Sequence, residues 1–190
     1  MKMKALAVAL MFATGVSLAG AQSSTWKFDS AHSSADFTIR HMGLSNVHGH
    51  FGNVTGVVTL DDKDITKSSV QAKVDTTTVD TGNAQRDTHL KSPDFFDVAK
   101  YPDMTFVSKQ ITNKDGKLQM TGDLTMHGVT KPVTLDLDGP SKEMVDPKGT
   151  AHRGMSATTS IHRADFGLNF GSGMLGDDVK VTLDVEMVKQ

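Results

Sequence analysis

Apolar and polar residues alternate with a period of two along most of this 190-residue chain. Such alternation is typical of β-strands that have one apolar and one polar face. The alternating runs are 35–41, 47–51, 54–60, 70–74, 104–108, 118–126, 133–137, 155–161 and 179–187. Turn-forming residues separate several of them, as in NKDG at 113–116 and HG at 127–128. The pattern predicts an all-β fold of eight or nine antiparallel strands.

Strands with one apolar face can close into a barrel or pack as a two-layered sandwich. The polar face carries mainly Lys, Asp, Thr and Ser, as the outer wall of a barrel in water requires. The apolar face mixes Gly and Ala with Phe and Met, and small inward residues leave space. Eight-stranded barrels can hold one small ligand, as lipocalins do. The composition of the two faces favours a barrel, although alternation alone is compatible with either fold.

The strand pattern is interrupted between residues 81 and 102, where charges cluster around two adjacent phenylalanines. Thr81 or Asn83 can cap a short helix over residues 85–91, because their side-chain oxygens can accept bonds from its first N–H groups. A Ser-Pro-Asp sequence at 92–94 then begins a second turn. Helices this short need packing partners, so the segment is expected to rest across one end of the β-structure. Its expected apolar anchors are Leu90, Phe95 and Phe96.

The first 21 residues have the layout of a secretory signal peptide. Lys2 and Lys4 precede an unbroken apolar run at 5–13, and the small residues Ala-Gly-Ala at 19–21 form a cleavage signal. The apolar run is shorter than the roughly 20 residues that span a bilayer. We therefore expect a signal peptide at 1–21, a single mature domain over 22–190, and localisation in the bacterial periplasm.

The chain contains no cysteine, and a lipoprotein anchor needs one at the cleavage site. The sequence therefore predicts a soluble protein that is not anchored to a membrane and that folds without disulfides. Its formal net charge is −2, with no basic stripe. Nucleic-acid-binding proteins normally carry a concentrated positive patch, so nucleic acid is excluded as an expected partner.

Two other patterns suggest chemistry but lack the context that it needs. His48 and His50 project from one face of a strand, and such pairs bind zinc when a third ligand joins them. The residues that alternate with them are apolar, which places both histidines on the outer side, so no metal site is predicted there. Residues 171–176 spell G-x-G-x-x-G but lie between antiparallel strands, so we interpret them as a turn. No G-x-S-x-G sequence is present, and we expect neither an enzyme nor a cofactor.

Five segments carry long and unusual motifs, among them VDTGNAQRDTHLKSPDFFDVAKYPDMTF at 79–106. The segments are Trp26–Phe51, Val79–Phe106, Gly122–Val133, Ile161–Leu168 and Gly176–Glu186. In this order, and over essentially the whole mature chain, they resemble the YceI-like polyisoprenoid-binding proteins. The resemblance implies a lipocalin-like, extended eight-stranded antiparallel β-barrel whose elongated apolar cavity holds a long isoprenoid or other lipid tail. It also implies export, a homodimer in many members, and no catalysis.

An isoprenoid tail presents only apolar surface, and its burial contributes roughly 25 cal/mol per Å². Its receptor therefore needs a long dry tube with few polar contacts, one of which meets the head group. Besides the three anchors, the residues expected to line this tube are Phe28, Phe37, Phe51, Met104, Phe106, Met126, Phe166 and Leu168. The candidates for the polar head are Arg86, Asp87 and His89.

Each of these assignments has a structural alternative. Alternating Phe and Met residues also fit an ordinary packed core. Arg86 and Asp87 can form a structural ion pair or capping network, and His89 can be a surface histidine with a local partner. The sequence thus favours an exported protein that sequesters or carries a polyisoprenoid or related long-chain lipid. The alternatives are a stress-related periplasmic structural protein with an incidental cavity, or a metal-binding protein.

Overall fold

The computed structural model describes residues 23–190, so the predicted signal peptide and its cleavage site lie outside the described residues. The described chain consists almost entirely of strands. They are β1 (Ser23–Phe28), β2 (Ser34–His41), β3 (Ser45–Phe51), β4 (Val54–Asp61), β5 (Ser69–Asp75), β6 (Asp103–Lys114), β7 (Lys117–Met126), β8 (Val129–Asp138), β9 (Met144–Val145), β10 (Ala151–His162) and β11 (Leu175–Lys189). One helix, α1 (Ala84–Leu90), and four short 3₁₀ turns complete this part of the chain.

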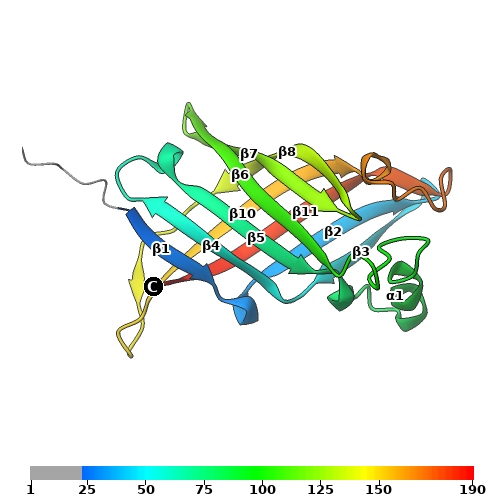
Figure 1. Ribbon diagram of the computed structural model, residues 1–190, viewed down its shortest axis with the longest axis horizontal. Coiled ribbons are helices and arrows are strands. Elements are labelled where there is room, and N and C mark those ends of the chain that lie inside the picture. Colours follow the sequence, from blue (N-terminus) through cyan, green and yellow to red (C-terminus); the bar gives the residue numbers. More distant parts are fainter. Residues whose placement is uncertain (1–22) are drawn as a thin grey trace, which may run out of the picture.

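The strands form one antiparallel sheet that closes on itself (Figure 1). Closure depends on β11, which pairs with β10 on one side and with both β1 and β2 on the other. β1 and β2 pair with successive parts of β11. On their other side, β1 pairs with β4 and β2 pairs with β3. If each of these pairs is taken as one interrupted strand and the two-residue β9 is left aside, the wall has eight strands. The prediction of an eight-stranded barrel is confirmed, and that of a sandwich is excluded.

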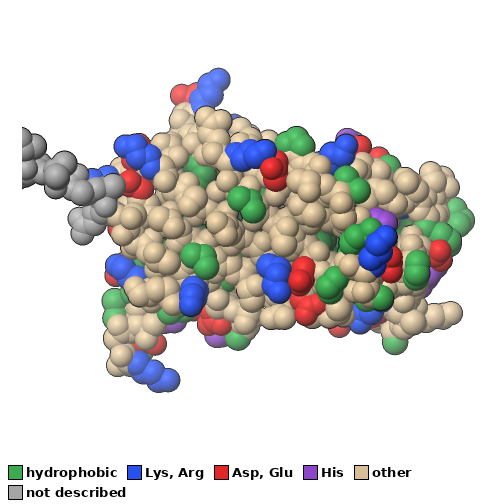
Figure 2. Space-filling view, in the orientation of Figure 1, with side chains coloured by type: hydrophobic (Ala, Val, Ile, Leu, Met, Phe, Trp, Pro, Cys, Tyr) green, Lys and Arg blue, Asp and Glu red, His purple; other side chains and the backbone are tan. Residues whose placement is uncertain are grey.

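The period-two pattern places one face of each strand inside the barrel. On β11, Val179, Val181 and Leu183 face the interior, while Lys180 and Asp184, at alternating positions of the same strand, are exposed. The outer wall mixes basic and acidic side chains with a few isolated apolar ones, and Figure 2 shows no large patch of one charge on the face in view. The wall is therefore apolar inside and polar outside, as the sequence pattern predicts.

The predicted helical insertion lies between β5 and β6, and Figure 1 shows α1 at one end of the barrel, beside β3. Asn83 is the N-cap, since its side-chain oxygen accepts the backbone N–H of Arg86 at 3.0 Å. The helix is thus confirmed with its first residue one position earlier than expected. The second expected turn is present as hydrogen-bonded turns, in which Ser92 O accepts from the N–H groups of Phe95 and Asp97.

Two clusters of buried residues occupy the two ends of the barrel. The floor cluster lies at the end formed by β1 and the C-terminus, opposite α1 (Figure 1). Its buried members are Trp26, Val58, Leu60, Val70, Phe106, Ile111, Met120, Leu135, Ala157 and Met187. The mouth cluster lies at the end that α1 covers. Its buried members are Ala35, Phe51, Val54, Val79, Met104, Met126, Phe166 and Leu168, and Leu90 and Phe96 of the insertion pack against them.

Candidate functional site

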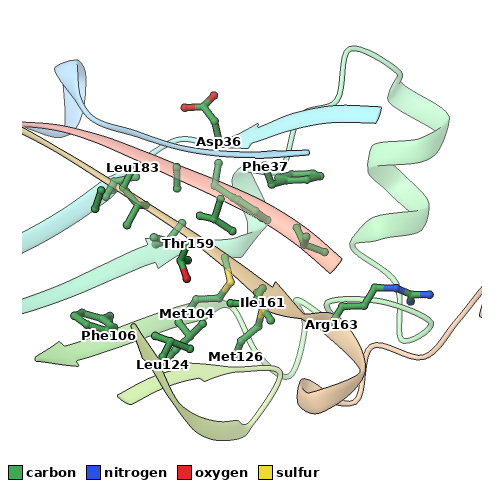
Figure 3. Close-up of a pocket in the computed structure, with 18 of the residues that line it drawn as sticks. Asp36, Phe37, Met104, Phe106, Leu124, Met126, Thr159, Ile161, Arg163 and Leu183 are labelled. Atoms are coloured by element: carbon green, nitrogen blue, oxygen red, sulfur yellow. The ribbon is translucent and has the colours of Figure 1, made fainter. Parts of the chain in front are cut away.

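An apolar cavity of about 490 Å³ occupies the barrel between the floor and the insertion. It reaches from Leu90 at the mouth to Met187 at the floor. Figure 3 shows Met104, Met126 and Ile161 converging on it from three different strands. Protein interiors are normally packed without voids larger than a water molecule, whereas ligand pockets range over about 300–1,000 Å³. The barrel is therefore hollow on the scale of a ligand site.

Three phenylalanine rings of the cavity lie against glycines of neighbouring strands. A Cβ atom on Gly49 would come within 2.4 Å of the Phe37 ring, and one on Gly56 within 2.6 Å of the Phe28 ring. Phe106 lies in the same way against a third glycine, at position 122. Because no real Cβ approaches so closely, the glycines allow the rings to lie along the wall. The small inward residues thus preserve the cavity indirectly, by receiving aromatic rings that would otherwise project into it.

Most of the residues predicted to bind ligand lie on the cavity wall, although their contact with a ligand remains a prediction. The structure brings the following together there: Phe28, Phe37, Phe51, Arg86, His89, Leu90, Phe95, Phe96, Met104, Phe106, Met126 and Leu168. Phe166 and Asp87 do not line the cavity. Phe166 lies in the 3₁₀ turn Arg163–Phe166, is only 2% exposed and packs within the mouth cluster.

Asp87 belongs to the capping network that the sequence left open as an alternative. Its Oδ1 accepts bonds from Thr81 N at 2.9 Å and from Thr81 Oγ1 at 2.5 Å. Arg86 reaches the same residue, donating from Nε to Thr81 Oγ1 at 2.7 Å and from Nη2 to Thr81 O at 2.8 Å. Both charged groups therefore hold the start of the insertion in place. Arg86 also lies at the cavity mouth, and a guanidinium carries further N–H donors beyond these two.

His89 is part of an aromatic cluster that spans the mouth. Its ring centroid lies 5.0 Å from those of Phe95 and Phe170, which are themselves 5.2 Å apart. Its Nε2 is 2.9 Å from Asp94 Oδ2, so the histidine has the local partner that the alternative interpretation expected. Phe170 belongs to the loop at 167–174 that precedes β11, hereafter the mouth loop. These three rings join the insertion to the mouth loop across the opening of the cavity.

Two residues at the mouth loop, Phe170 and Arg163, were not predicted from the sequence. Arg163 is 6% exposed, and its guanidinium donates to Gly176 O at 3.0 Å and to Phe170 O at 2.8 Å. A third bond goes to Leu168 O. Arg163 therefore fixes the backbone that carries Phe170, and buried charge is tolerated because carbonyl oxygens surround it. The only sequence signal was an arginine directly after a strand in the motif IHRADFGL.

The two strand histidines considered as zinc ligands lie away from the cavity. His48 and His50 are exposed on β3, and Phe51 next to them is buried, as the alternation predicts. Among residues 23–190 there is no helix that is both long and apolar enough to cross a bilayer.

The chain is similar to known proteins over nearly its whole length. A model of the YceI-like domain matches residues 26–187. Protein YceI of Escherichia coli O157:H7 is 38% identical over 185 residues, which cover 95% of this chain and 93% of that protein. The crystal structure of a Campylobacter jejuni YCEI protein matches with a TM-score of 0.70 and 33% identity, over 80% of this chain and 90% of that one.

A more distant solved structure is a polyisoprenoid binding domain from Saccharophagus degradans that is implicated in plant cell wall breakdown. It matches with a TM-score of 0.62 and 15% identity, over 87% of this chain and 98% of that domain, a likeness that concerns the fold alone. The family match and the Escherichia coli relative both extend along the barrel and its insertion. This protein is accordingly a member of the YceI-like family.

Proposed function

We propose that this protein is an exported binding protein that holds a polyisoprenoid or related long-chain lipid inside its barrel. The observation that carries the proposal is the continuous apolar cavity between floor and mouth. The polyisoprenoid binding domain of Saccharophagus degradans, which shares the fold, supports the same class of ligand. The cavity wall is almost wholly apolar and offers few groups that could act as acid, base or nucleophile, so the proposed function is binding.

The two ends of the cavity differ in a way that predicts the orientation of the ligand. The floor is filled by Trp26, which is completely buried, so an apolar tail end fits there. The mouth carries Arg86, whose guanidinium can meet an oxygen or a phosphate of a head group. We therefore expect the lipid to enter tail first and to keep its polar head at the insertion.

A chain-length series of prenyl alcohols tests the binding function. Each buried methylene contributes about 0.8 kcal/mol, so affinity should rise with tail length and then level off once the tail fills the cavity. Affinity is measured by displacement of a fluorescent apolar probe from the purified full chain. A flat response to tail length would contradict a tube that buries the tail.

Native mass spectrometry of gently purified protein separates a carrier from a protein with an incidental cavity. A lipid that survives dialysis supports the carrier. Protein that is repeatedly empty, and that also takes up no added prenyl alcohol, would overturn the proposal.

Export is the part of the proposal that depends on the N-terminal sequence. Its signal-peptide layout supports cleavage before Gln22 and release into the periplasm. N-terminal sequencing of the protein recovered from a periplasmic fraction should begin at that residue. A chain that keeps residues 1–21 and stays in the cytoplasmic fraction would contradict export.

A further inference from the structure

The junction between β1 and β2 bulges out of the barrel wall beside β11. On either side of it, Phe28 pairs with Met187 and Ser34 pairs with Asp184. Two residues of β11 thus face five residues of the junction, which fold into a 3₁₀ turn at Ser30–His32. Bulges of this kind re-aim side chains and commonly occur beside functional sites.

This bulge brings Asp29 and His32 to Glu186, which is more than 150 positions away in the chain. One potential ligand atom from each of the three side chains lies within 4.8 Å of the other two. In a tetrahedral zinc site with bonds of about 2.0–2.2 Å, ligand atoms lie about 3.4 Å apart. Small side-chain rotations would therefore suffice to bring one nitrogen and two carboxylate oxygens to a single ion.

The backbone holds this arrangement in place. Asp29 N donates to Glu186 O at 2.8 Å, and His32 N donates to Asp29 O at 3.1 Å. Glu186 N donates to Ser33 Oγ at 3.2 Å. The Asp29 side chain also caps the turn by accepting from Ala31 N at 3.0 Å. All three candidate ligands are thus attached to one hydrogen-bonded frame, which lowers the cost of assembling a site.

The charges of the cluster favour a cation. Within the described residues, the ion-pair partners of Asp29 and Glu186 are histidines, His32 at 2.9 Å and His152 at 2.8 Å. Among the ion pairs of residues 23–190, neither carboxylate is paired with a lysine or an arginine. His152 is mostly buried, and its Nδ1 contacts Glu186 Oε1. Such an outer partner orients a ligating carboxylate in metal sites.

We propose that Asp29, His32 and Glu186 bind a divalent transition-metal ion, with water completing the coordination. One imidazole and two carboxylates suit zinc and its neighbours in the first transition row better than calcium or magnesium, which prefer oxygen ligands alone. None of the three side chains lines the lipid cavity. The site is therefore independent of the proposed lipid binding, and failure of one leaves the other standing.

Calorimetric titration with ZnCl₂ tests the proposal, using the full chain without a polyhistidine tag and after treatment with a chelator. One zinc ion should bind per chain with a Kd in the micromolar range, and magnesium should give no heat. His32→Ala and Glu186→Gln should each weaken binding by at least 10-fold. Asp29→Asn should do the same while keeping the cap, since asparagine is as good an N-cap as aspartate.

His162→Ala is the matched control. His162 Nδ1 also lies near two carboxylates, 3.4 Å from Asp177 Oδ2 and 2.9 Å from Asp178 Oδ1. Among residues 23–190, however, only the cluster at Asp29 converges on a common centre. Zinc affinity should change less than twofold in the control. Absence of zinc binding, or an equal loss in His162→Ala and in folded Asp29→Asn, would overturn the proposal.

Discussion

The floor and the mouth of the barrel are both closed, but by different means. At the floor, Trp26 projects from the wall itself, and the side chains of Arg153 and Lys189 lie 5.2 and 5.5 Å from its ring. Arg153 is paired in turn with Asp62 and Glu143, at 3.5 and 3.8 Å. At the mouth, the closing residues come from segments that are not part of the wall, namely the insertion and the mouth loop (Figure 1).

This difference indicates which end admits a ligand. Opening the floor would expose the fully buried Trp26 and break its cation–π contacts. It would also separate strands that are hydrogen-bonded along their length. Opening the mouth would separate the aromatic cluster of His89, Phe95 and Phe170, in which Phe170 is already 45% exposed. Elements that move for binding are drawn from the less stable parts of a fold. The mouth is therefore the expected entrance.

The largest expected effect is a loss of stability at the floor. Trp26→Ala should lower the free energy of unfolding by about 3–5 kcal/mol, because it leaves a large buried space at the end of the wall. Phe170→Ala at the mouth should cost less than about 1 kcal/mol, since the ring is partly exposed. Urea denaturation of both variants measures the difference. Equal losses would show that the two ends are not distinct in stability.

The second effect concerns the cavity that lies between the two ends. Phe106→Arg should reduce the affinity for a fluorescent prenyl probe by more than about 100-fold, since an unpaired charge would enter an apolar tube. Val107→Arg is its control, because the next residue of β6 points outward and is 48% exposed. Phe37→Arg, nearer the mouth, provides a second test if Phe106→Arg does not fold. Unchanged affinity in a folded variant would place ligand binding elsewhere.

A third variant moves a cavity ring without changing it. A Cβ on Gly49 would overlap side-chain atoms of Phe37 and Thr81 at 2.4–2.8 Å, so Gly49→Ala should push the Phe37 ring into the cavity near the mouth. We expect roughly 10-fold weaker probe binding, which is about 1.4 kcal/mol. Gly52→Ala is the control, because its Cβ would meet nothing within 4 Å. Equal affinities in the two variants would mean that the ring has room to move elsewhere.

The wall of the barrel could be predicted from the sequence because its signal is local. In a strand, the direction of each side chain follows from its neighbours, so alternation alone places Phe37, Phe106 and Met126 inside. The ends of the barrel depend on segments that break this rule. Phe166, for example, lies in the 3₁₀ turn after β10, where alternation no longer gives the direction of a side chain, and it packs in the mouth cluster. Leu168, two residues later, still reaches the cavity.

Contacts between distant segments could not be predicted from spacing. Arg163 donates hydrogen bonds to backbone carbonyls in and just after the glycine-rich mouth loop. The positions of carbonyl oxygens cannot be inferred from residue types. Asp29 and His32 meet Glu186 only because β1, β2 and β11 are neighbours in the closed sheet. The sequence therefore predicts the wall of the barrel. The residues that close its ends, or that meet on its outer surface, can be identified only from the fold.

The smallest expected effect is a pH dependence at the mouth end, where β5 meets the insertion. The side-chain hydroxyl of Thr77, followed by the amide of Asn53, holds the pKa of Asp75 below its ordinary value. A carboxyl whose pKa is lowered by folding stabilises the protein above its unfolded pKa, near 3.9, and this contribution is lost as the pH falls through the lower folded value. Asp75→Asn should therefore reduce the fall in Tm between pH 5 and pH 3 by a few degrees at most.

Asp138→Asn is the matched control for this measurement. Asp138 is exposed, and its side chain makes no hydrogen bond or salt bridge within residues 23–190. Thermal unfolding of the parent and both variants across this pH range should show the smaller acid loss only in Asp75→Asn. The same change in both variants would assign the acid sensitivity to net charge. It would then belong to the whole barrel and would not distinguish the mouth from the floor.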